Sequence, residues 1–209
     1  MKWYWAGGCL ALMTMLYLIY QSIKWGSVEH KWQEWFFKGA ATAMAAVLAF
    51  YGYSFSLSPV HLMTAIGLSV CVLADVILDL SFLTGTVFFG IGHLCYCAAL
   101  LMSGPPGRTS LAVFMLLAAA VAVLYPQIKK LSKGKSALPY LAYALLISAM
   151  LSLAIGQKPL MMAGALLFVV SDIMLLFRIV RNISSKCYDY LAMGCYYLAQ
   201  FLIASSTVF

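Results

Sequence analysis

The sequence predicts an all-α polytopic membrane protein, folded as a bundle of eight transmembrane helices. The first observation is composition: 65% of the 209 residues are hydrophobic, only 9% are charged, and the mean hydropathy is +0.96. The second is that apolar stretches of about 20 residues, long enough to cross a bilayer, follow one another with short connections. These observations exclude an ordinary soluble domain, and we expect a single transmembrane domain over residues 1–209.

Hydropathy and interfacial residues place the eight spans in order along the chain. The first span is expected to be a retained helix, because it is too long for a cleaved signal and has no small-x-small site after it. The following stretch, residues 25–37, mixes tryptophan with charge and is expected to lie in the membrane interface. The spans are predicted at 3–23, 36–54, 59–80, 85–103, 109–128, 138–156, 160–180 and 188–208.

The net charge of +7 is distributed as a topology signal, and no nucleic-acid partner is expected. Basic residues concentrate in the first, fifth and seventh connections, which the positive-inside rule places in the cytoplasm, with both termini on the other side. The opposite side has only Lys2, Arg108 and Lys158. The ten residues on the cytoplasmic side are Lys24, Lys31, Lys38, Lys129, Lys130, Lys133, Lys135, Arg178, Arg181 and Lys186.

Two carboxylic acids lie within apolar spans. Asp75 and Asp172 are expected at bilayer depth, where a charged side chain costs about 3 kcal/mol or more and so faces a cavity or the protein interior. Such residues mark a functional site, although an interhelical hydrogen bond is the structural alternative. Counting residues from the span ends puts further polar residues at similar depth. The residues expected to line one cytoplasm-facing pocket are Asp75, Asp172, His93, Tyr196 and Lys38.

The two acidic spans resemble each other, because a glycine stands eight residues before each aspartate, at Gly67 and Gly164. The two spans are the third and the seventh, an offset of four spans, so both would have the same orientation. A pseudo-two-fold axis along the membrane normal would then relate two four-helix repeats. That symmetry would bring both aspartates to one cavity.

Four motifs stand in order from the third span onward. They are Ala74-Asp75, the Gly- and Phe-rich stretch that ends in His93-Leu-Cys-Tyr96, Gly164-Ala-Leu-Leu-Phe-Val-Val-Ser171-Asp172, and Tyr196-Tyr197-Leu-Ala199-Gln200. In these motifs the chain resembles the YhhN family of integral-membrane lysoplasmalogenases. It departs from the family pattern at Ala74, where a glycine is usual, and at Gly39, where a proline is expected after Lys38.

The resemblance implies hydrolysis of the vinyl-ether bond of a lysoplasmalogen to a fatty aldehyde and a glycerophospho-base. It implies a lysophospholipid substrate, contact with membrane lipids and, we expect, location in a bacterial inner membrane. No cofactor is expected. The chemistry needs a proton on the β-carbon of the vinyl ether, and a water that captures the oxocarbenium-like ion.

Two carboxylates in different protonation states can supply both steps, by analogy with glycosidases. Burial favours the neutral form of a carboxyl group, so one of the pair can act as the acid. We therefore predict Asp75 and Asp172 as the catalytic pair, with either one as the donor. Lys38 is either a snorkelling residue or a phosphate contact, and the tyrosines either pack or position water and a choline-type cation. The supporting or substrate-binding candidates are His93, Tyr96, Tyr196, Tyr197, Ser171, Lys38 and Gln200.

Two other functions fit parts of the same pattern. Parallel repeats with intramembrane acids also occur in proton-coupled transporters, but matching Gly- or Pro-broken spans are lacking here. A metal-dependent lipid hydrolase could use Asp75, Asp79, His93 and Asp172 as ligands. No metal is expected, because only one histidine, His93, lies away from the span ends, there is no His-rich cluster, and the six cysteines have no metal-type spacing.

Overall fold

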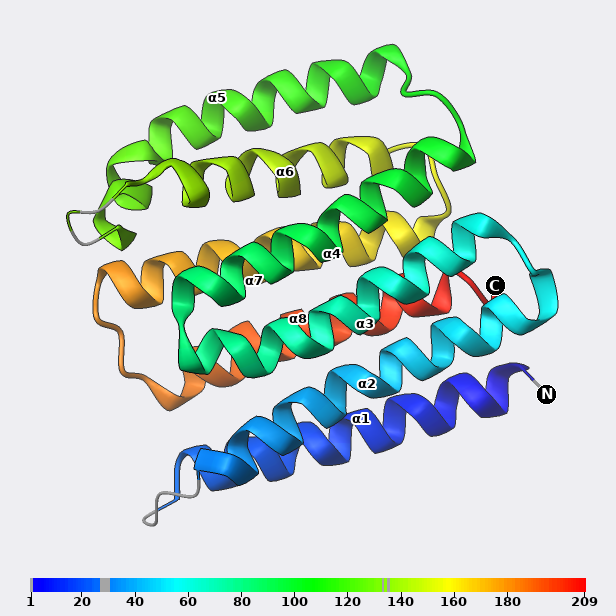
Figure 1. Ribbon diagram of the computed structural model, residues 1–209, viewed down its shortest axis with the longest axis horizontal. Coiled ribbons are helices and arrows are strands. Elements are labelled where there is room, and N and C mark those ends of the chain that lie inside the picture. Colours follow the sequence, from blue (N-terminus) through cyan, green and yellow to red (C-terminus); the bar gives the residue numbers. More distant parts are fainter. Residues whose placement is uncertain (1, 27–30, 133, 135) are drawn as a thin grey trace.

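The computed structural model describes residues 2–26, 31–132, 134 and 136–209. Over these residues the chain forms eight α-helices and no strand, and the helices run up and down along one long axis (Figure 1). The fold is therefore the predicted all-α polytopic bundle. The helices are α1 (Lys2–Lys24), α2 (Lys31–Ser56), α3 (Pro59–Leu80), α4 (Phe82–Ser103), α5 (Arg108–Leu131), α6 (Leu138–Ala154), α7 (Pro159–Val180) and α8 (Lys186–Ser205).

Proline and serine set several helix ends. α3 and α7 begin with proline, whose fixed φ suits the first helical turn. Ser81 alone separates α3 from α4, and its hydroxyl accepts a hydrogen bond from the Thr84 amide. Ser185 caps α8 in the same way. The main departure from the predicted spans is α2, which begins at Lys31 and so includes the described end of the predicted interfacial stretch.

The helices differ in how apolar they are. Among the described residues, α1, α3, α4, α5 and α7 are long and apolar enough to be recognised as membrane spans, and α6 is apolar but shorter. The two remaining helices, α2 and α8, are more polar because they bury groups such as Lys38, Thr42, Asp189 and Gln200. α2 and α8 pack against each other, so their polar residues meet inside the bundle.

Helices adjacent in sequence pack side by side with the exception of α4 and α5, whose described residues do not pack together; α1 lies at one edge of the bundle and α5 at the other (Figure 1). Contacts distant in sequence join α2 to α8 and α4 to α6. If α1–α4 and α5–α8 are two repeats, α4 is equivalent to α8 and α6 is equivalent to α2. The α4–α6 contact is then equivalent to the α8–α2 contact, as two repeats of one orientation require. The contact of α5 with α7 has no counterpart between α1 and α3, so the two halves differ in detail. The pseudo-two-fold axis itself stays a prediction.

The crossing of α3 and α4 is close, and glycines make it possible. A Cβ added at Gly67 would lie 2.6 Å from Cε1 of Tyr96, and one at Gly92 would lie 2.8 Å from the sulfur of Cys71. Small residues at such crossings let helix backbones approach in a membrane, where van der Waals packing drives association. This crossing fixes Tyr96 against α3.

The two ends of the bundle differ in charge. The connections α1–α2, α5–α6 and α7–α8 lie at one end, and both termini lie at the other (Figure 1). We call the first the basic end, since the described residues Lys24, Lys38, Lys129 and Arg178 belong to it, together with four more basic residues. Lys133 and Lys135, also assigned to this side, lie outside the described residues.

The charge asymmetry predicts that the basic end faces the cytoplasm. In a background without the six native cysteines, Ser136→Cys should be protected from an impermeant thiol reagent in intact cells, and Gly107→Cys at the opposite end should react. Both positions are exposed, whereas Ser132 in the same connection is buried and would not report orientation. Labelling of Ser136→Cys with protection of Gly107→Cys would reverse the topology.

Candidate functional site

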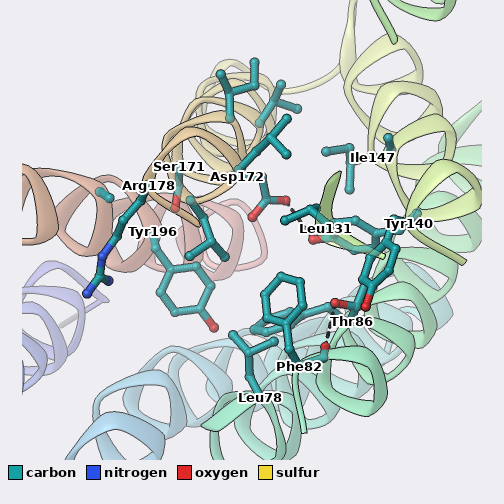
Figure 2. A pocket seen from close by; sticks show the side chains of 18 of the residues that line it. Leu78, Phe82, Thr86, Leu131, Tyr140, Ile147, Ser171, Asp172, Arg178 and Tyr196 are labelled. Atoms are coloured by element: carbon teal, nitrogen blue, oxygen red, sulfur yellow. Dashed lines mark hydrogen bonds between the residues drawn. The ribbon is translucent and has the colours of Figure 1, made fainter. Parts of the chain in front are cut away.

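A cavity of about 230 Å³ opens near the basic end and is lined by residues of all eight helices. Its polar wall holds both predicted aspartates, Asp75 from α3 and Asp172 from α7. Its apolar part runs between α5, α6 and α7, where leucine, isoleucine, valine and alanine side chains line it. Figure 2 shows Asp172 and Tyr196 on one side of this space and Leu131, Tyr140 and Ile147 on the other.

Asp75 accepts two hydrogen bonds at the same oxygen. Thr42 Oγ1 on α2 donates to Asp75 Oδ2 at 2.5 Å, and the Tyr196 hydroxyl on α8 donates to it at 2.8 Å. The Asp75 side chain is almost completely buried. A carboxylate oxygen that accepts two O–H donors is well satisfied without any proton of its own. This arrangement suits an ionised Asp75.

A chain of hydrogen bonds continues from Asp75 into the bundle. The side-chain amide of Gln200 donates from Nε2 to the Tyr196 hydroxyl at 3.0 Å, and Tyr96 donates to Gln200 Oε1 at 3.1 Å. The thiol of Cys71 lies 3.5 Å from the Tyr96 hydroxyl. Since that hydroxyl has one hydrogen and gives it to Gln200, Cys71 donates at this contact. Each donated hydrogen in this network therefore points along it toward Asp75.

Asp172 has a different set of partners. Its Oδ2 accepts one hydrogen bond from the Tyr143 hydroxyl on α6, at 2.7 Å. The Asp172 side chain is half-buried and projects into the cavity (Figure 2). The two aspartates thus share one cavity but are held by separate donors, two hydroxyls for Asp75 and one for Asp172.

His93 is fully buried behind the cavity wall, and our expectation that it lines the pocket is wrong. Its Nδ1 lies 2.7 Å from the Phe89 carbonyl oxygen, so Nδ1 carries the hydrogen and donates it. The ring is fixed edge-on to Phe168, at 4.5 Å between centroids, which turns it away from the cavity. Its Nε2 atom has no hydrogen-bond partner within the part of the chain that the structure describes. The ring also packs against Tyr143 and Tyr96, one from each hydrogen-bond network.

Lys38 is buried and forms an ion pair with Asp79, with Nζ 3.0 Å from Oδ1. It therefore does not snorkel freely to the interface. The Lys38 carbonyl oxygen accepts a hydrogen bond from Tyr197, which is buried outside the cavity. The predicted residues that line the cavity are Asp75, Asp172, Lys38, Ser171 and Tyr196, and those that lie behind its wall are His93, Tyr96, Tyr197 and Gln200.

Sequence reasoning missed Asp189, which is completely buried on the cavity wall. Lys24 Nζ lies 2.8 Å from Asp189 Oδ2 and 3.0 Å from Asp189 Oδ1. The Trp25 indole N–H donates to Asp189 Oδ2 at 3.2 Å, and Arg178 Nη1 contacts Asp189 Oδ1. The place of Asp189 at the start of a span, opposite basic residues at the ends of other spans, is a signal that could have identified it.

Thr42 and Tyr143, the donors to the two aspartates, were also missed. Hydroxyl residues are common in membrane helices and hydrogen-bond across them, so neither residue stands out in the sequence.

The described residues contain no group of three or more His, Cys, Asp and Glu side chains placed to hold a metal ion. Asp79 is engaged by Lys38, and His93 donates within its own helix. The four side chains considered as ligands, Asp75, Asp79, His93 and Asp172, therefore do not converge on one point.

Comparison with known proteins gives one match. The sequence profile of the YhhN family matches residues 33–207, which include every predicted site residue from Lys38 to Gln200. No curated protein and no solved structure matches the chain significantly.

The ion pairs of Asp189 predict a stability effect. Asp189→Ala leaves Lys24 and Arg178 without their buried counter-charge, and should lower the free energy of unfolding by about 3–5 kcal/mol. Glu34→Ala, at a partly exposed position near the start of α2, should change it by no more than about 0.5 kcal/mol. Thermal unfolding of the purified proteins in detergent measures both. An Asp189→Ala protein as stable as wild type would contradict the role given to this residue.

Proposed function

The chain belongs to the YhhN family, and from that premise we propose that it is a lysoplasmalogenase, an ether hydrolase that cleaves the vinyl-ether bond of lysoplasmalogens. The products are a fatty aldehyde and glycerophosphocholine or glycerophosphoethanolamine. The observation that carries the proposal is that Asp75 and Asp172 line one cavity while holding different sets of hydrogen-bond donors.

The shape and chemistry of the cavity support a single-chain amphiphile as substrate. Charged side chains gather at the basic end of the cavity, and the space between α5, α6 and α7 is apolar. α5 is the least buried of the apolar helices, so the apolar part of the cavity lies close to the lipid-facing surface. A lysophospholipid places its headgroup and its hydrocarbon chain in the same order. With the basic end in the cytoplasm of a bacterial cell, the substrate would enter from the inner leaflet.

The donor sets support different roles for the two aspartates. Asp75 accepts two O–H groups and is the carboxylate that deprotonates water. Asp172 accepts one and, as the neutral acid, gives its proton to the β-carbon of the vinyl ether. Protonation of that carbon places positive charge on the α-carbon, where the ether oxygen stabilises it. The Asp172 carboxylate formed in this step also stabilises the cation.

Water then adds to the α-carbon as Asp75 accepts its proton, which gives a hemiacetal. The hemiacetal hydroxyl returns a proton to Asp172 as the carbon–oxygen bond to glycerol breaks, and Asp75 protonates the departing glycerol oxygen. The reaction consumes one water and leaves both aspartates as they began. Thr42 and Tyr196 hold Asp75 for this exchange, and Tyr143 orients Asp172.

The hydrogen-bond chain behind Asp75 does not support the alternative of a proton-coupled transporter. Gln200 accepts a hydrogen bond at Oε1 and donates another from Nε2, so the incoming and outgoing hydrogens are on different atoms. A proton cannot pass along this amide without forming its imidic tautomer. This chain of hydrogen bonds therefore holds Asp75 in place and is not a path for protons across the membrane.

Replacing either aspartate tests the proposal. Asp75→Asn and Asp172→Asn should each lower turnover of a 1-alkenyl lysophospholipid by about 10²–10⁴, the usual cost of losing an acid or base. Glu34→Gln is the matched acid-to-amide control and should keep wild-type turnover. Aldehyde release from purified, folded protein in detergent is the measurement. Near-normal turnover in one aspartate variant would remove that residue from the chemistry.

Substrate selectivity separates this chemistry from that of a lipase. Only a vinyl ether gives a stabilised cation on protonation, so the 1-alkenyl lyso-lipid should be cleaved while the 1-alkyl and 1-acyl analogues bind and inhibit. The three lipids are compared at equal concentration for aldehyde and fatty acid release. Fatty acid release from the acyl lipid at the rate of aldehyde release would point to nucleophilic ester hydrolysis.

The proposed mechanism uses only side chains, so exhaustive chelation should leave the rate of hydrolysis unchanged. The protein is assayed before and after dialysis against a chelator. Loss of activity that one equivalent of a metal restores would require Asp75 and Asp172 to be reassigned as ligands.

A further inference from the structure

Lys24, Arg178 and Asp189 form a charged cluster on the wall of the cavity at its basic end. The carboxylate of Asp189 has no exposure, whereas the side chains of Lys24 and Arg178 are 20% and 26% exposed. The two cations therefore contact Asp189 on one side and keep part of their surface open. Arg178 engages Asp189 through Nη1, and its guanidinium carries further N–H donors. Figure 2 shows its side chain extending away from Asp172.

The cluster has a net charge of +1. Two cations share a single carboxylate, which is further satisfied by the Trp25 indole N–H. The other ion pair on the cavity wall, Lys38 with Asp79, is balanced. A single anionic group in the cavity would therefore be attracted to Lys24 and Arg178 rather than to Lys38.

The spacing along α7 matches the dimensions of a lysophospholipid. Arg178 follows Asp172 by six residues, which is about 9 Å of helix at the usual rise. Seven bonds separate the phosphorus of the substrate from the β-carbon of its vinyl ether. At the reach of an extended chain this path is about 8–9 Å long. The axial rise between Arg178 and Asp172 is therefore of the same size as the path from the phosphorus to the β-carbon.

We propose that Lys24 and Arg178, held in place by Asp189, bind the phosphodiester of the lysophospholipid headgroup. This inference rests on the proposed function for its substrate. Asp189 is a positioning residue: it fixes two flexible cations before the ligand arrives, so that less side-chain entropy is lost on binding. The phosphate contact then sets how far the chain enters the apolar part of the cavity.

Binding of a ligand that cannot be hydrolysed tests the inference. The dissociation constants of a 1-O-alkyl lysophosphocholine and of the phosphate-free 1-O-alkylglycerol are measured with purified protein in an uncharged detergent. Arg178→Gln and Lys24→Gln should each weaken binding of the phosphate-bearing ligand by about 10–100-fold, and leave the alkylglycerol unaffected. Arg181→Gln is the matched control, because Arg181 lies at the same end but outside the cavity wall.

A double variant controls for the fold. Arg178→Gln with Asp189→Asn removes one cation and one anion, so the cluster keeps its net charge of +1 and Lys24 loses its counter-charge. Its affinity for the phosphate-bearing ligand should lie between those of Arg178→Gln and wild type, with alkylglycerol binding unchanged. Wild-type affinity in both Arg178 variants, or an equal loss for both ligands, would overturn the inference. Inorganic phosphate should not displace the lyso-lipid, and displacement that depends on Arg178 would instead make this a site for free phosphate.

The binding readout separates this inference from the proposed reaction. A wild-type protein that binds the phosphate-bearing ligand through Arg178 but releases no aldehyde from the alkenyl lipid would contradict the proposed reaction alone. A protein that releases aldehyde while its Arg178 variants bind normally would contradict the phosphate site alone.

Discussion

The hydrogen bonds received by Asp75 constrain much of the bundle. A carboxylate among apolar helices is expensive unless donors are brought to it, and here the donors come from α2 and α8. The side chain of Gln200 then extends the network to Tyr96, so that α4 is tied to the same point. The packing of α8 against α2 meets this need, as does the close crossing of α3 with α4, which holds Tyr96 within reach of Gln200.

The basic end serves two purposes in this account. Basic residues there bias the topology of the chain, and three of them, Lys24, Lys38 and Arg178, also line the cavity, where the proposed headgroup would enter. The two aspartates belong to the same cavity, and across from them the lining between α5, α6 and α7 is apolar. The order of anion site, acid–base pair and apolar slot is the order of phosphate, vinyl ether and chain in a lysoplasmalogen. In the proposed reaction, this gradient of polarity would select the substrate and orient it.

The number of helices, their order and the two acidic positions could be predicted because hydropathy and span length are local properties of the sequence. The position of each polar residue along its helix could be predicted as well, by counting residues from the span ends. The rotation of each helix about its own axis could not be predicted from the sequence. For this reason we expected His93 in the cavity, whereas Phe89 and Phe168 fix its ring behind the cavity wall. The contacts made by Thr42, Tyr143 and Asp189 could not be predicted either. They depend on which helices cross, and the packing of the bundle determines those crossings.

The central claim is that the cavity adds water to the α-carbon of a cation made by protonating carbon. Hydrolysis of the alkenyl lyso-lipid in ¹⁸O-labelled water, with mass analysis of both products, tests this most directly. The account predicts ¹⁸O in the aldehyde and none in the glycerophospho-base, whose hydroxyl groups do not exchange with water. Label in the glycerol hydroxyl would mean that water attacked the glycerol carbon, and would contradict the roles given to Asp75 and Asp172.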